Sequence, residues 1–270
     1  MTLHRRALLA AVLAPAVVRA QRDPLRITLA PYLSPGALLA AWRPLREQLQ
    51  QRLARPVELL TARDFRALAD ATRRGEHEVA QLPAHLARMA MLDWRWQPLP
   101  SPHEQVTVIV AVKGDGPVRS AADLRGQPVG MLDPLSLTAT IGRRWLQRQG
   151  LDAGSPVVTM ASVNSALHAL AAGEVAAVVA ADSQLTALPP GTPRGERVLA
   201  SVTDIPGPQF IARPDLGSGE LAQLREAMGA FVHDPAKPVN AANAPLRMTE
   251  PARLAALDDL VGLARAALSR

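Results

Sequence analysis

Hydroxyl side chains gather in the stretch from Asp133 to Thr140, which reads Asp-Pro-Leu-Ser-Leu-Thr-Ala-Thr. The stretch follows the apolar run Val129–Leu132, which predicts a strand, and it opens a predicted helix. The N-terminus of a helix has free backbone N–H groups and a partial positive charge. Backbone donors and hydroxyls together suit a phosphonate, a phosphate or a carboxylate without a full cation. We therefore predict that four residues here bind an anion: Ser136, Leu137, Thr138 and Thr140.

A structural explanation of the same hydroxyls is equally open from the residues alone. Every helix needs an N-cap, and Ser and Thr are among the residues favoured there. Ser136 or Thr138 can therefore serve only to cap the helix that follows.

Aromatic residues are scarce in this chain, which has one Tyr and three Phe among 270 residues. Tyr32 follows the predicted strand Leu25–Ala30, and Phe65 follows the predicted strand Val57–Thr61. Ligands of α/β sheets bind at the carboxyl ends of strands, so aromatic residues in these strand-to-helix loops are candidate ligand contacts. For Phe65, packing beneath the loop is a serious alternative.

No catalytic or metal-binding motif stands out. The chain has no Cys, which excludes disulfides, thiolate metal sites and a Cys nucleophile. It contains no HxxxH, no GxSxG and no phosphate-binding GxxxxGKS/T motif. Of the six histidines, four are scattered at His85, His103, His168 and His233. We therefore expect no catalytic residue, no metal and no cofactor, and we predict that the protein is not an enzyme.

The first twenty residues are typical of a secretory signal peptide. Arg5 and Arg6 form a basic start, Ala7–Val18 is apolar, and Val18-Arg19-Ala20 has small residues at the spacing that signal peptidase needs. The apolar run is too short to span a bilayer, and a buried N-terminal helix is the alternative. We predict that residues 1–20 are removed on export to the periplasm, by either the general secretory or the twin-arginine route.

The charge balance does not point to a nucleic-acid partner. The formal net charge is +6, and three of the arginines, Arg5, Arg6 and Arg19, lie in the predicted signal peptide. Their removal leaves about +3, and no Lys/Arg run is interleaved with aromatics. We expect no nucleic-acid binding and no further membrane segment.

Predicted strands and helices alternate in two series along the mature chain. The first series covers residues 25–91, and Pro44 is expected to kink or split its first helix. The second series covers residues 121–180, after the apolar strand Val106–Val112. Gln209–Ala212 predicts a return strand, and two helices follow at residues 218–231 and 251–268. We predict an α/β fold of two lobes joined by a two-strand hinge, divided into residues 21–109 (first lobe), 110–208 (second lobe) and 209–270 (return to the first lobe and C-terminal helices).

Several of these stretches, in the same order, resemble the periplasmic substrate-binding proteins of phosphate, phosphite and phosphonate ABC transporters. The matching segments are residues 25–34, 55–65, 75–83, 172–177 and, most strongly, 120–136. The resemblance spans most of residues 24–231. It implies a type II periplasmic-binding-protein fold that closes on a small ligand, and delivery to an inner-membrane permease with its ATPase. It implies neither a cofactor nor catalysis.

The resemblance also implies roles for individual residues. Ser136 and Thr138 match the hydroxyl positions of the family's anion-binding loop. Phe65 stands where the family often has Tyr.

Three further positions depart from the family or match it loosely. Asn164 stands where many members carry His, so a possible cation becomes an amide, and an N-cap is its alternative role. Asp182 matches an acid that takes the ammonium group in aminophosphonate binders, and an exposed turn residue is the alternative. Gly207 lacks an acid that some members use. These departures bear on phosphonate specificity and leave the fold unaffected.

Three functions follow from these features. The first is a monomeric periplasmic solute-binding component of an ABC transporter, which binds a small oxyanion or organic acid between its lobes. The second is a sensing module that presents the same fold to a membrane kinase or cyclase. The third is an enzyme on the same fold, such as porphobilinogen deaminase, which needs a Cys that this chain lacks.

Overall fold

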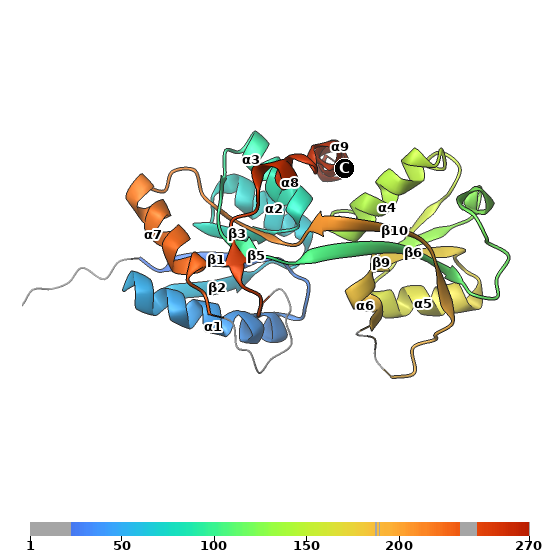
Figure 1. The fold of residues 1–270 in the computed structure, drawn as a ribbon, viewed down its shortest axis with the longest axis horizontal. Helices are drawn as coiled ribbons and strands as arrows, with labels where there is room; N and C mark the ends of the chain where they lie inside the picture. The colour runs from blue at the N-terminus through green and yellow to red at the C-terminus, as the bar shows by residue number, and fades with distance from the viewer. Residues whose placement is uncertain (1–22, 187, 189, 233–241, 270) are drawn as a thin grey trace, which may run out of the picture.

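The computed structural model describes residues 23–186, 188, 190–232 and 242–269. The predicted signal peptide, residues 1–20, lies outside them. Figure 1 shows two α/β bodies side by side, with the first lobe on the left and the second lobe on the right. Each body is built on its own five-stranded sheet. Two long strands, β6 (Gln105–Lys113) and β10 (Glu196–Pro206), run from the middle of the molecule into the second lobe.

The sheet of the first lobe has the order β2-β1-β3-β11-β4. Its three parallel strands are β1 (Leu25–Leu29), β2 (Val57–Thr61) and β3 (Val79–Leu82). The antiparallel strand β11 (Gln209–Ala212) pairs with β3 on one side and with β4 (Gln97–Pro98) on the other. The predicted return strand is therefore confirmed. The helices of this lobe are α1 (Pro35–Leu53), α2 (Phe65–Arg74), α3 (Ala84–Asp93) and α7 (Ser218–Gly229).

Helix α1 runs without a break through Pro44, so the predicted split is wrong. A proline removes the hydrogen bond to the carbonyl four residues earlier, which here belongs to Ala40. Ala40 and Pro44 are both exposed, so water can solvate the freed carbonyl. The buried stripe of the helix lies on its other side and is formed by Leu38, Trp42, Leu45 and Leu49.

Helix α2 shows how local signals set the ends of an element. The Asp64 carboxylate accepts a hydrogen bond from the Ala67 N–H at 2.7 Å and caps the first turn. Gly75 ends the helix with φ 68, a left-handed conformation that glycine adopts at little cost.

The sheet of the second lobe has the order β10-β6-β9-β7-β8. Strands β7 (Val129–Met131), β8 (Val157–Thr159) and β9 (Ala177–Ala181) are parallel, whereas β6 and β10 pair antiparallel at one edge. The helices of this lobe are η1 (Ala121–Leu124), α4 (Leu137–Arg148), α5 (Val163–Ala172) and α6 (Asp182–Thr186).

The chain passes between the two sheets at two places. All of β6 pairs within the second sheet, so the first passage lies before Gln105, after the short strand β5 (Ser101–Pro102). The second passage lies between the end of β10 at Pro206 and the start of β11 at Gln209. The predicted lobe boundary at residues 109 and 110 falls inside β6, and the exact division into lobes stays a prediction.

The C-terminal part adds β12 (Leu246–Arg247), which pairs with β5, and helices α8 (Pro251–Ala255) and α9 (Asp258–Leu268). The single predicted helix over residues 251–268 is therefore wrong, because the chain turns at Ala256 and Leu257. Asp258 and Asp259 fall in the first turn of α9, where negative charge is favourable. Helix α9 packs against α3 of the first lobe and α4 of the second lobe.

The described residues contain neither a candidate membrane-spanning helix nor a candidate metal-binding group. None of the helices in residues 23–186, 188, 190–232 and 242–269 has the length and apolar content to cross a membrane. Within the same residues, no three His, Asp or Glu side chains are grouped so that they could hold a metal ion.

Candidate ligand-binding site

The predicted anion-binding loop lies between β7 and α4, as the sequence indicates. Ser136 is the N-cap of α4, and its Oγ accepts a hydrogen bond from the Ala139 N–H at 3.2 Å. The Thr138 hydroxyl lies 3.2 Å from the same Oγ. Capping therefore accounts for one acceptor position of Ser136. One hydroxyl hydrogen makes the bond between Ser136 and Thr138, and the other remains for donation to a further group.

Two backbone donors at the start of α4 are unused. The loop amides of Leu135 and Ser136 bond to Asp133, and the Ala139 and Thr140 amides bond to Ser136. The N–H groups of Leu137 and Thr138 have no acceptor among the described residues. These two amides and the two hydroxyls together form a group of donors that suits an oxyanion. The Leu137 side chain itself is buried in the apolar core.

Thr140 has a different environment from the other two hydroxyls. Its Oγ1 donates to the Ser136 carbonyl at 3.0 Å and lies 3.1 Å from Nε2 of His85 on α3. His85 is fully buried, and desolvation lowers its pKa to about 3, with the Leu135 backbone acting in the opposite direction. The imidazole is therefore neutral at physiological pH, and it ties the two lobes together at this point.

The two predicted aromatic residues form a pair in the first lobe. The rings of Tyr32 and Phe65 meet edge to face, with centroids 5.4 Å apart and planes at 64°. Phe65 is buried at the start of α2, whereas Tyr32 exposes 42% of its surface. Tyr32 is thus accessible at the surface, and Phe65 packs against its ring.

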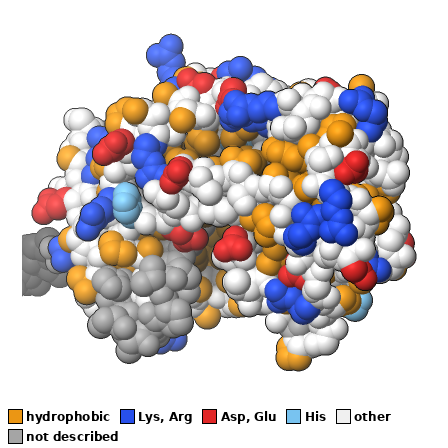
Figure 2. Space-filling view, turned by 45° about the vertical axis from the view of Figure 1, so that its right-hand side comes forward, with side chains coloured by type: hydrophobic (Ala, Val, Ile, Leu, Met, Phe, Trp, Pro, Cys, Tyr) orange, Lys and Arg blue, Asp and Glu red, His pale blue; other side chains and the backbone are white. Residues whose placement is uncertain are grey.

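The predicted anion-binding loop and Phe65 share one buried cluster at the junction between the lobes. Leu135, within the loop, belongs to the buried cluster that also holds Ala30, Phe65 and Leu86 of the first lobe. The loop is therefore not on an outer surface. Figure 2 shows the surface hollowed between the two bodies in the lower half of the view.

The other two predicted residues stay within the second lobe. Asn164 accepts a hydrogen bond from the Thr192 hydroxyl at 2.7 Å, and Ser162 caps α5 in its place. The alternative role of Asn164 as an N-cap is therefore wrong. Asp182 is exposed at the start of α6, directly after β9. No described contact brings either side chain to the anion-binding loop, and their ligand roles stay predictions.

Two polar residues at the junction were not predicted. His85 lies in the first turn of α3, shortly after the carboxyl end of β3, a position that could have identified it. Glu104 lies in the first passage between the sheets and has a buried carboxylate oxygen without a hydrogen-bond partner among the described residues. Burial raises the pKa of the Glu104 carboxyl above its ordinary value.

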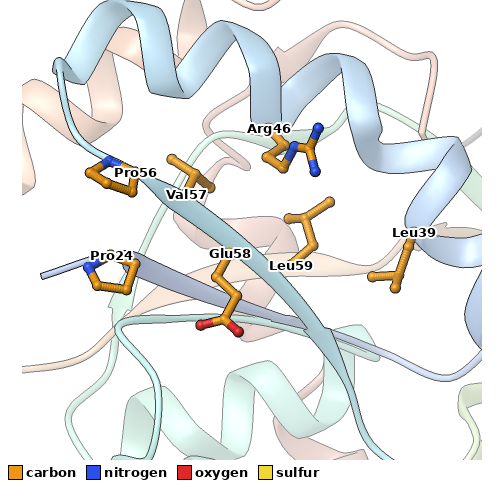
Figure 3. A pocket seen from close by; sticks show the side chains of 7 residues that line it. All are labelled: Pro24, Leu39, Arg46, Pro56, Val57, Glu58 and Leu59. Carbon is orange, nitrogen blue, oxygen red and sulfur yellow. The ribbon is translucent and has the colours of Figure 1, made fainter.

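A separate cavity of about 320 Å³ opens at the far end of the first sheet. Figure 3 shows its lining, with Leu39 and Arg46 on α1 above β2 and with Pro24 and Pro56 just before β1 and β2. These prolines precede the amino ends of the strands, and ligands of α/β sheets bind at the carboxyl ends. None of the predicted site residues lines this cavity.

Comparison with known proteins decides the family. The model of the periplasmic substrate-binding proteins of phosphonate ABC transporters matches residues 27–253. The chain belongs to this family. A search of curated protein sequences found no match.

Three of the solved structures that share the fold of this chain are described here, and all three have low sequence identity to it. XAC2383 from Xanthomonas citri, bound to ATP, has a TM-score of 0.77 at 16% identity, over 92% of this chain and 99% of that one. PhnD1 from Prochlorococcus marinus, in complex with methylphosphonate, has a TM-score of 0.71 at 11% identity, over 87% and 96%. A binding component of the phosphonate transporter of Pseudomonas aeruginosa has a TM-score of 0.69 at 15% identity, over 91% and 88%. The fold is that of the type II periplasmic binding proteins, as predicted.

Proposed function

We propose that this family member binds a small oxyanion or organic acid between its lobes and delivers it to an inner-membrane ABC permease. The observation that carries the proposal is the pair of unpaired N–H groups at Leu137 and Thr138, beside the hydroxyls of Ser136 and Thr138. These donors lie where the first lobe meets the second. The family is periplasmic and serves transport, which supports this location and the absence of catalysis. We propose that the exported protein acts as a monomer.

The charge of the site favours a singly charged anionic head. Among the described residues, the side chains hydrogen-bonded to the loop include no Lys or Arg, and the imidazole that contacts it, His85, is neutral. Backbone dipoles and hydroxyls stabilise one negative charge well, and a second charge without a cation is held less well. A phosphonate monoanion, a sulfonate or a carboxylate therefore fits better than a dianionic phosphate.

The first experiment removes the hydroxyl donors. The double substitution Ser136→Ala with Thr138→Val is expected to weaken ligand binding about tenfold or more, because hydrogen bonds to a charged group are lost. Calorimetry measures the affinity, with a ligand identified by mass spectrometry of small molecules released from the purified protein.

A matched control separates binding from helix capping. Ser162 caps α5 as Ser136 caps α4, with its Oγ accepting from the Ser165 N–H at 3.1 Å. Ser162→Ala is expected to lose about 1 kcal/mol of stability, as any cap does, with unchanged affinity. Equal affinity in the double variant and the parent protein would remove the loop from the site.

A further inference from the structure

His85 is a titratable side chain that is fully buried where the two lobes touch. It belongs to α3 of the first lobe, and its Nε2 lies 3.1 Å from the Thr140 hydroxyl on α4 of the second lobe. Its neighbours in sequence take part in different buried clusters, Ala84 in that of the second lobe and Leu86 in one of the first lobe. The imidazole therefore lies where apolar groups of both lobes meet.

The hydrogen bonds around Thr140 fix the protonation of the imidazole. Thr140 donates its only hydroxyl hydrogen to the Ser136 carbonyl at 3.0 Å, so toward His85 it can only accept. Nε2 of His85 therefore carries a hydrogen, and in the neutral ring Nδ1 has none. Nδ1 is buried without a hydrogen-bond partner among the described residues. A second proton, on Nδ1, would place a positive charge in this buried position, which is costly.

No charged side chain of the described residues is placed to compensate such a charge. The charged groups near His85 in the fold lie on α3 and α4, on the elements packed against them, in the anion-binding loop and in the first passage. They are Arg88 and Asp93 of α3, Arg66, Asp70, Arg73 and Arg74 of α2, Arg253 of α8, Asp258, Asp259 and Arg265 of α9, Arg143, Arg144 and Arg148 of α4, Lys113 of β6, Asp133 of the loop and Glu104 of the passage. All of them are at least partly exposed, and the described hydrogen bonds and ion pairs join none of them to His85.

Burial makes the pKa of His85 depend on whether the lobes are closed. In the closed arrangement, in which His85 bonds Thr140, desolvation lowers the pKa to about 3, the Leu135 backbone opposes this change, and no charged side chain contributes. Separation of the lobes would let water reach the ring and return the pKa to ~6.5. Because the pKa is lower in the closed arrangement, closure is fully stable above ~pH 6.5 and weakens as the pH falls below that value.

We propose that His85 makes the closure of the lobes sensitive to protons, so that the neutral imidazole permits closure and its protonation in acid separates the lobes. The motion is a property of the ligand-free protein. Its consequence for a ligand, release in acid, rests on the proposed function.

A distance measurement between the lobes tests the proposal without a ligand. The chain has no Cys, so Arg73→Cys on α2 and Gln147→Cys on α4 place one spin label on each lobe at exposed positions. Electron–electron double resonance then gives the populations of short and long distances. The ratio of closed to open molecules is expected to fall about a hundredfold between about pH 7.5 and about pH 4.5, since the open form takes up a proton that the closed form refuses.

Three variants separate His85 from other groups that titrate in this range. His85→Gln keeps an N–H that can reach Thr140 and has no proton to gain, and His85→Leu fills the same site with an apolar group. In both variants the ratio is expected to change less than about threefold over the same range. His77→Gln is the matched control, because His77 is also buried and bonds Thr72 at 3.2 Å within the first lobe. This control is expected to open in acid as the parent does.

The contrary results are equally definite. The same distances in the labelled parent at both pH values would overturn the proposal and leave the anion site untouched. Opening of His85→Gln and His85→Leu to the extent of the parent would assign the effect to other groups, such as the acids of α9, and would also overturn it. Circular dichroism accompanies each measurement, and a loss of helical signal in step with the distance change would show unfolding in place of opening and contradict the proposal.

Discussion

The two lobes meet along two junctions of very different construction. On the strand side, two short passages connect the sheets, and the described contact between them is the backbone bond from Gly207 to Glu104. On the helix side, α9 packs against both α3 and α4, and α8 packs against α3 (Figure 1). Leu254, Leu257 and Leu260 belong to the buried cluster of the second lobe, and Val261 and Ala264 to a cluster of the first lobe.

Ion pairs of α9 also connect the helix side to both lobes. Adjacent acids at the start of α9 pair with arginines of different lobes. Asp258 pairs with Arg88 of α3 at 2.6 Å, and Asp259 pairs with Arg144 of α4 at 2.6 Å. Near the other end of α9, Arg265 pairs with Asp93 of α3 at 2.5 Å. The helix side thus holds the lobes through side chains, whereas the strand side holds them through the backbone.

This difference indicates on which side the separation of the lobes costs more free energy. Register shifts interrupt β10 near the second passage, and Asp204 there has φ 59. A bulged strand bends more than a regular one, so this end of β10 is suited to a hinge. Separation on the helix side would expose buried leucines, so we expect that side to set the balance between closed and open lobes.

The largest expected effect comes from Leu260→Ala in α9. Truncation of a buried leucine is expected to lower the free energy of unfolding by about 2–5 kcal/mol and to increase the radius of gyration of the ligand-free protein. Leu224→Ala, in the core of the first lobe, is the matched control with a similar stability loss. Urea unfolding and small-angle scattering measure the two quantities. Equal scattering curves for both variants would contradict a role of α9 in holding the lobes.

A second comparison uses two similar Thr–His pairs. Thr140 bonds His85 across the lobes, and Thr72 bonds His77 at 3.2 Å within the first lobe. Thr140→Val and Thr72→Val are each expected to cost about 1–3 kcal/mol, because a buried histidine loses its partner. Only Thr140→Val is expected to change ligand affinity as well. If calorimetry found the same affinity in both variants, the interlobe bond would have no part in closure.

The smallest effect is expected from the adjacent acids of α9. Asp259→Asn removes the pairing with the second lobe, and Asp258→Asn removes a pairing on the side of α3. Both pairs are partly exposed, so each is worth about 0.2–1 kcal/mol and weakens with salt. Asp259→Asn alone is expected to reduce the salt dependence of ligand affinity. Identical salt dependence in the two variants would show that neither pair holds the lobes.

Much of the fold could be predicted because each element carries local signals. Apolar alternation marks β1, and the cap at Asp64 and the glycine at residue 75 mark both ends of α2. The predictions failed where contacts between residues far apart in the sequence determine whether a helix continues or ends. The split at Pro44 did not occur because the freed carbonyl of Ala40 faces solvent. The break between α8 and α9 falls at Ala256 and Leu257, where α8 packs against α3 and α9 packs against both α3 and α4.

The candidate site could be predicted only in part, for the same reason. Ser136 and Thr138 follow a strand and open a helix, which is a local pattern. The pairing of His85 with Thr140 spans 55 positions in sequence and depends on which segments meet at the junction. One carboxylate oxygen of Glu104 is buried without a hydrogen-bond partner among the described residues, and no sequence pattern predicts this.

The central claim is that the free amides at the start of α4 hold the anionic head of the ligand. A crystal structure of the protein with its tightest-binding ligand tests it most directly. The account predicts an oxygen of the head within hydrogen-bond distance of the Leu137 and Thr138 nitrogens, between closed lobes. An anionic head bound elsewhere, with both amides left free, would contradict it.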